Sequence, residues 1–210
     1  MSTNQVTNDS KVVAIASIAA ELHSVMNIAW GVSLAAKNAK VISAQAGEEA
    51  LGFQPITNFI DEISRSAIHG VDEINHEALK LSRITVSEQR ASDAHRRFTS
   101  VISRNKDTAH IGSLSFGMEQ VEKNLRHAQS EYKKCLANLV SMLESMDECM
   151  LSAHTIASVS RIVTSSINGY SDKLGTVADD LDEAARSIKE KVSQSYIHLS
   201  SINTPAHKHR

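Results

Sequence analysis

Residues 46–55 read Ala46-Gly47-Glu48-Glu49-Ala50-Leu51-Gly52-Phe53-Gln54-Pro55. The two glycines interrupt the apolar pattern that runs on either side, and the proline fits only the first turn of a new helix. A helix that ends before this stretch would therefore meet a second helix that begins near Gln54. The stretch predicts an antiparallel helical hairpin over residues 11–104, with its tip at 46–54.

The arm before the turn carries apolar or small residues at alternating steps of three and four. This heptad spacing is typical of supercoiled helices. It predicts a helix that starts at Ser10, a good N-cap residue, after a flexible N-terminus at residues 1–10. The seam, meaning the line of core-facing positions, is Ile15, Ile18, Leu22, Val25, Ala29, Val32, Ala36, Ala39, Ser43 and Ala46.

The arm after the turn is expected to run from about Gln54 to Arg104. Its seam weakens over the polar stretch from Ser87 to Arg97. The seam positions are Ile56, Ile60, Ile63, Ala67, Gly70, Ile74, Glu77 or Ala78, Leu81 and Ile84.

The second half of the chain follows a predicted linker at 105–112. Its heptad register continues from Leu114 to Ile188 without a break, so residues 113–202 could form one helix or two. Asn168-Gly169 is the best turn signal, and we predict a turn within 152–172 and a flexible tail at 203–210. The expected fold is all-α, with long antiparallel helical hairpins in a coiled-coil four-helix bundle. The second half could pack on the first, or two copies of the first hairpin could pair.

The composition limits the class of protein. Basic and acidic residues nearly balance, at 22 and 24, so nucleic acid is not an expected partner. Without a run of 18 apolar residues, no membrane span is expected. Cys135 and Cys149 lie 14 residues apart on one predicted helix and cannot pair within it, which favours a reduced, cytoplasmic chain.

No residues form a recognisable catalytic or cofactor-binding motif, so we expect neither an enzyme nor a bound cofactor. Glu73 and His76 have the spacing found in di-iron helical bundles, but no second Glu-x-x-His follows. They are expected to lie on a solvated helix face, and no metal site is predicted.

Residues 28–67 resemble the cytoplasmic signalling tip of bacterial methyl-accepting chemotaxis proteins. The most specific part of the match is Ala46-Gly47-Glu48 followed by Gly52-Phe53 at the family's spacing. The matching positions are Ile28, Ala29, Leu34, Ala36, Asn38, Ala39, Val41, Ala44, Ala46, Gly47, Glu48, Gly52, Phe53 and Ile56.

The resemblance implies that the tip binds a chemotaxis coupling protein and a histidine kinase, and that the chain forms a homodimer. Trp30 would either pack in the core or face another dimer. The residues expected to contact partners are Trp30, Asn38, Ile42, Gln45, Glu48, Glu49, Gly52 and Phe53.

The sequence also departs from the family. Ile42 and Gln45 stand where the family has a glutamate and an arginine, which removes charge-assisted hydrogen bonds that could fix how dimers meet. Glu88 and Gln89 partly match the family's methylation pattern. The expected function is signal transduction through helix packing and contacts at the tip. The alternative is a structural or adaptor bundle that has lost kinase coupling.

Overall fold

The computed structural model describes residues 3–104, 112–167 and 169–203. The chain forms four long helices, α1 (Thr3–Ala46), α2 (Gln54–Arg104), α3 (Ser113–Thr164) and α4 (Ser171–Asn203). A short 3₁₀ helix, η1 (Gly47–Phe53), joins α1 to α2. This confirms the predicted all-α fold of long antiparallel hairpins.

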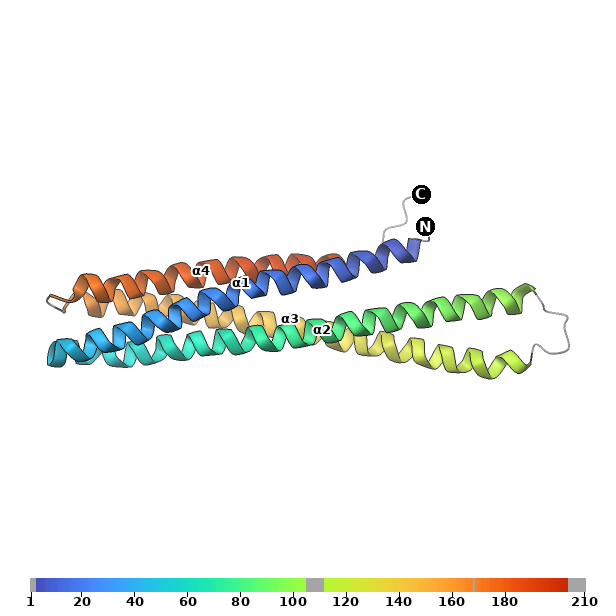
Figure 1. Ribbon diagram of the computed structural model, residues 1–210, viewed down its shortest axis with the longest axis horizontal. Coiled ribbons are helices and arrows are strands. Elements are labelled where there is room, and N and C mark those ends of the chain that lie inside the picture. The colour runs from blue at the N-terminus through green and yellow to red at the C-terminus, as the bar shows by residue number, and fades with distance from the viewer. Residues whose placement is uncertain (1–2, 105–111, 168, 204–210) are drawn as a thin grey trace.

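The four helices form one rod-shaped bundle within a single chain (Figure 1). Each helix packs on two neighbours, α1 on α2 and α4, and α3 on α2 and α4. The second hairpin, α3–α4, therefore covers the core-facing side of the first. Of the two arrangements that the sequence left open, the structure has the one in which the second half packs on the first.

Both short connections lie at the same end of the rod, which we call the tip (Figure 1). They lie close together, since a Cβ at Gly52 of η1 would be 3.8 Å from Val163 Cγ1 of α3. At the other end α2 and α3 continue beyond α1 and α4 as a two-helix extension. The last buried side chain of α2 is that of Thr85, and Ala128 is the first buried residue of α3 among those described.

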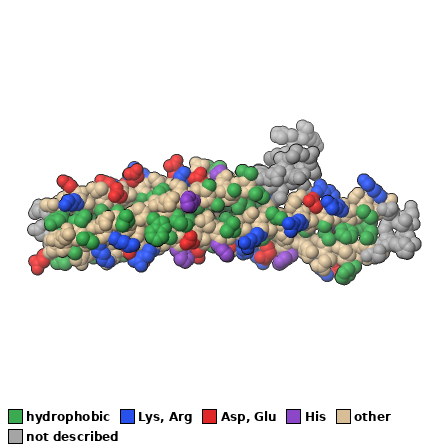
Figure 2. Space-filling model, viewed as in Figure 1, with side chains coloured by type: hydrophobic (Ala, Val, Ile, Leu, Met, Phe, Trp, Pro, Cys, Tyr) green, Lys and Arg blue, Asp and Glu red, His purple; other side chains and the backbone are tan. Residues whose placement is uncertain are grey.

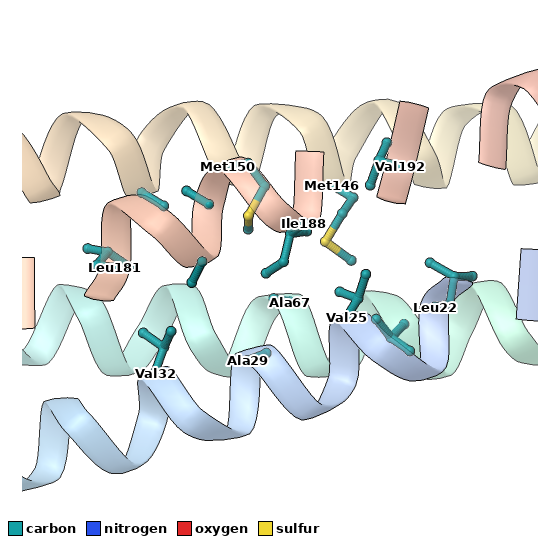
Figure 3. Packing of buried hydrophobic residues seen from close by; sticks show 14 of the residues in the cluster. Leu22, Val25, Ala29, Val32, Ala67, Met146, Met150, Leu181, Ile188 and Val192 are labelled. Atoms are coloured by element: carbon teal, nitrogen blue, oxygen red, sulfur yellow. The ribbon is translucent and has the colours of Figure 1, made fainter. Parts of the chain in front are cut away.

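The core is built mainly from the predicted seams, but in α2 the predicted Ile63 and Gly70 are only partly buried, and the neighbouring Ser64 and Val71 are buried. Every predicted seam residue of α1 is buried except Ala46, which is partly buried. Many seam residues are alanine or serine, so the helices approach closely, and methionines fill the wider gaps. Figure 3 shows Met146 and Met150 of α3 beside Ile188 of α4 and Ala67 of α2.

The start of the first helix differs from the sequence prediction. The break in the second half decides between one helix and two. Helix α1 begins at Thr3, before the expected start at Ser10, and therefore includes residues 3–10 of the segment expected to be a flexible N-terminus. The second half contains two helices, and the break at 165–170 falls inside the predicted window. Gly169, with φ of 76°, adopts a left-handed conformation that favours glycine. Residues 105–111 of the predicted linker at 105–112 and residues 204–210 of the predicted tail at 203–210 lie outside the described residues.

Candidate functional site

The tip is held rigidly from inside. Gly47 has φ of 59°, which ends α1 and starts η1 at a conformation that other residues adopt only with strain. Ser43 Oγ donates a buried hydrogen bond of 3.0 Å to the carbonyl oxygen of Ala50. Ala50 and Phe53 are fully buried beneath the turn. The outward side chains of the turn are therefore presented from a fixed backbone.

The predicted contact residues at the tip divide into three groups. Asn38, Gln45, Glu48 and Gly52 are exposed, and Ile42 is half-buried. Phe53 was predicted to contact a partner, but its side chain is 0% exposed and belongs to the core, so that assignment was wrong. The side chain of Glu49 lies outside the described residues.

Sequence reasoning missed one residue of the tip. Leu51 is 57% exposed in the middle of η1, beside Glu48 and Gly52. A single exposed apolar side chain is ordinary on a protein surface, so it is the position of Leu51 among the predicted contact residues that adds it to this group. The sequence does contain a signal for Leu51. It lies in the four-residue segment between the two glycines and belongs to neither predicted seam, so it was not expected to be buried. We call Asn38, Ile42, Gln45, Glu48, Leu51 and Gly52 the tip surface.

Trp30 does not pack in the core. It is 56% exposed on the outer face of α1, where it borders a shallow groove between α1 and α2. Ser33 Oγ crosses this groove with a 3.2 Å hydrogen bond to Asp61 Oδ1, and Lys40 Nζ donates to Asn58 Oδ1 at 2.8 Å. The groove is lined by Trp30, Ser33, Lys37, Asp61, Arg65, Ile68, His69 and Asp72.

A buried carboxylate ties α3 to α4 near the tip. Asp182 of α4 accepts hydrogen bonds from His154 Nδ1 at 2.5 Å, Arg161 at 3.0 Å and Arg186 at 2.6 Å. Burial of Asp182 opposes ionisation, but the hydrogen bonds from these three residues outweigh it and hold the pKa of the carboxyl group well below its usual range. Arg161 also binds Asp179 at 2.9 Å.

A second polar contact joins α2 to α3 near the middle of the bundle. Burial works to raise the pKa of Glu77, yet contacts with Cys135, Lys80 and Asn138 lower it overall. Asn138 Nδ2 donates to Glu77 Oε1 at 3.2 Å. Burial raises the pKa of the Cys135 thiol to about 12. Such a thiol is unreactive, because the thiolate is the nucleophile.

The candidate methylation residues lie where the four-helix bundle gives way to the extension. Glu88 is partly buried and pairs with Lys11 of α1 at 3.4 Å, and Gln89 Nε2 donates to Asp93 at 3.2 Å. Lys11 also lies 4.5 Å above the ring of Tyr132. Glu88 therefore connects α1 to α2 at this level of the rod.

The histidines and glutamate that were considered for a metal site are exposed on α2. His69 Nδ1 lies 3.2 Å from Glu73 Oε2, and His76 points to solvent one heptad further on. Among the residues that the structure describes, no three His, Cys, Asp or Glu side chains come together in a group that could hold a metal ion.

Comparison of the chain with protein-family models, with curated proteins and with solved structures gives no match. The geometry of the tip and of α1 therefore provides the basis for a functional proposal.

Proposed function

We propose that the chain is a cytoplasmic signal-transduction module, similar to the signalling part of a chemoreceptor, which acts through contacts at the hairpin tip. The observation that carries this proposal is the tip surface itself. Gln45, Glu48 and Leu51 project from a turn whose backbone is fixed by Gly47 and by the buried side chain of Phe53. The same turn carries the residues that resemble the chemoreceptor tip.

The packing of the bundle supports a role in transmission. Alanine and serine at many core positions let neighbouring helices slide by small amounts without large changes in side-chain volume. Each pair of neighbouring helices is also joined by side-chain pairs, such as Lys191–Glu21 at 2.8 Å between α4 and α1. Packed interfaces of this kind can switch between two discrete arrangements, and a shift at one end would then reach the other.

The proposed partners are a chemotaxis coupling protein and a histidine kinase. The full chain, immobilised, would be mixed with each purified partner, and retention would be measured. We expect Leu51→Glu to abolish retention, because it replaces the exposed apolar side chain of the tip surface by a charged one. The matched control is Leu151→Glu on α3, which is 64% exposed and about 20 Å from the end of that helix.

Two results would reject this function. If neither partner is retained by the unaltered chain, the module does not couple to that kinase. If Leu51→Glu and Leu151→Glu reduce retention equally, the contact is not at the tip. Circular dichroism of both variants checks that the helices are intact.

A second candidate function is a structural or adaptor bundle. The specific observation in its favour is that Ile42 and Gln45 replace the family's acid–base pair, and that Ile42 is partly covered by its own bundle. An adaptor would retain other proteins through the tip surface without any effect on kinase activity. The same retention assay, with kinase activity measured in parallel, separates the two functions.

A further inference from the structure

A second heptad pattern runs along α1, on the side opposite to its core seam. It begins at Val13 and ends at Val41, a distance of about 42 Å along the helix. All nine of its residues are exposed, and the largest are Trp30 and Leu34, at 56% and 61%. We call this set the α1 stripe: Val13, Ala16, Ala20, His23, Asn27, Trp30, Leu34, Lys37 and Val41.

The stripe makes α1 apolar on nearly all sides. Over Lys11–Ala46 the helix is apolar enough, by length and composition alone, to cross a membrane, although only 33% of the most apolar window is buried in the bundle. A helix of this kind normally has a further apolar neighbour. Figure 2 shows apolar side chains recurring along this face of the rod.

Exposed apolar residues of α2 widen the same face. Leu79 is 61% exposed and Val86 38% exposed on α2. Since Lys11 of α1 pairs with Glu88 of α2, these two residues lie near the N-terminal half of the stripe. The apolar face thus extends over both halves of α1.

We propose that this face pairs with the same face of a second copy of the chain, in antiparallel orientation. A two-fold axis beside Val25 would place each stripe residue from Val13 to Lys37 opposite the one whose number makes a sum of 50, and Val41 would lie beyond the paired segment. Trp30 then faces Ala20 of the second copy, and Leu34 faces Ala16. The two large side chains of one half meet the two small ones of the other half, so the stripe is complementary to itself.

The polar members of the stripe fit the same register. His23 lies opposite Asn27 of the second copy, and the symmetry repeats this contact on the other side of the axis. Polar layers in a helical interface help to fix register, because a shifted antiparallel pairing would place these polar groups opposite apolar side chains. In hydrocarbon these side chains would have no such partners, which disfavours a lipid surface as the occupant.

The orientation follows from Lys37. A parallel pairing, with both tips at one end, would place Lys37 opposite Lys37 of the second copy and repel the two charges. The antiparallel pairing places Lys37 opposite Val13, near the end of the contact, where its ammonium group can reach water. The tip surfaces would lie at opposite ends of the dimer. The pairing therefore leaves Gln45, Glu48 and Leu51 free and does not depend on the proposed function.

The mass of the full chain in solution tests the pairing. Light scattering after size exclusion is expected to give twice the chain mass of 22.9 kDa. Leu34→Glu should raise the Kd of the dimer by about 30-fold or more, as loss of a hot-spot residue does. The matched control Leu151→Glu, at a similarly exposed leucine, should leave the mass unchanged.

A cysteine cross-link tests the orientation. An equal mixture of Ala16→Cys and Leu34→Cys chains, under mild oxidation, is expected to give the mixed disulfide dimer. Burial raises the pKa of both native thiols, Cys135 and Cys149, so the unaltered chain should not cross-link.

Three outcomes would overturn the proposal. The first is a monomeric mass at chain concentrations of tens of micromolar. This result overturns the pairing whether or not the protein floats with phosphatidylcholine vesicles, and flotation would identify a lipid surface as the occupant instead. The second is a dimer that Leu34→Glu does not weaken. The third is a disulfide formed by Leu34→Cys alone, which would mean that the helices pair in parallel. Loss of kinase binding in Leu51→Glu with an intact dimer would bear on the tip function only.

Discussion

At the scale of single residues, Asp182 shows how a buried charge is made stable in this bundle. Its side chain is only 5% exposed, yet it accepts hydrogen bonds from two arginines and a histidine on two helices. Removing one partner from a buried charged group leaves the others without compensation. The partners of Asp182 reach solvent, so water can solvate them when the carboxylate is removed. This reduces the loss of folding stability that the removal causes.

We expect Asp182→Asn to lower the free energy of unfolding by about 2 kcal/mol at neutral pH. The control Asp179→Asn, which alters an exposed partner of Arg161, should lower it by less than about 0.5 kcal/mol. The pKa of Asp182 is lower in the folded state, so its contribution is complete above its unfolded pKa of about 3.9 and is lost as the pH falls below it. Urea titrations followed by circular dichroism should show a constant gap between unaltered chain and variant from pH 5 to 7, narrowing below about pH 4. A gap that widens in acid would contradict this account.

At the scale of elements, replacing Gly31 of α1 and Gly47 of η1 by alanine should have opposite effects on the free energy of unfolding. Gly47 has positive φ at the end of α1, whereas Gly31 is exposed inside the helix, with no atom within 4 Å of the place that a Cβ would occupy. Gly47→Ala should destabilise the chain by about 1 kcal/mol, because alanine is strained in the left-handed region. Gly31→Ala should stabilise it by about 0.5 kcal/mol or more, since alanine is the better helix former. Urea unfolding measures both, and equal signs for the two changes would disprove the assigned turn geometry.

Most seam positions of the helices could be predicted from the sequence, because burial against neighbouring helices imposes a heptad spacing of apolar and small residues. The α1 seam and the start of α2 at Gln54 were correct for this reason. The break between α3 and α4 was placed only within a window, because the turn at 165–170 keeps the heptad register on both sides. The exposed α1 stripe was missed, since His23, Asn27 and Lys37 make it read as an ordinary solvated face. Asp182 was missed because two of its three partners, His154 and Arg161, come from a neighbouring helix, which no local pattern reveals.

At the scale of the whole molecule, stability should differ between the body of the rod and the extension. In the body each helix has two neighbours, whereas in the extension α2 and α3 have only each other (Figure 1). From Val86 to Arg104 no described side chain is fully buried. Phe98 of α2 packs closely on Gly117 of α3, where a Cβ added to the glycine would lie 3.1 Å from the ring. The inward side is partly polar, as in the pair His95–Glu122 at 3.9 Å.

Hydrogen exchange measured by mass spectrometry should resolve this difference within a single helix. Amides at 89–104 of α2 are expected to exchange at least about tenfold faster than those at 60–81, because opening the extension exposes less apolar surface than opening the body. The two segments share the same helix, so solvent and temperature effects cancel in the comparison. Asp93→Ala, which removes the ion pair to Arg96 and the contact to Gln89, should speed exchange in the extension and leave 60–81 unchanged. Equal protection along all of α2 would mean that the extension opens only with the whole molecule, and that a signal applied there would reach the tip without a separate local step.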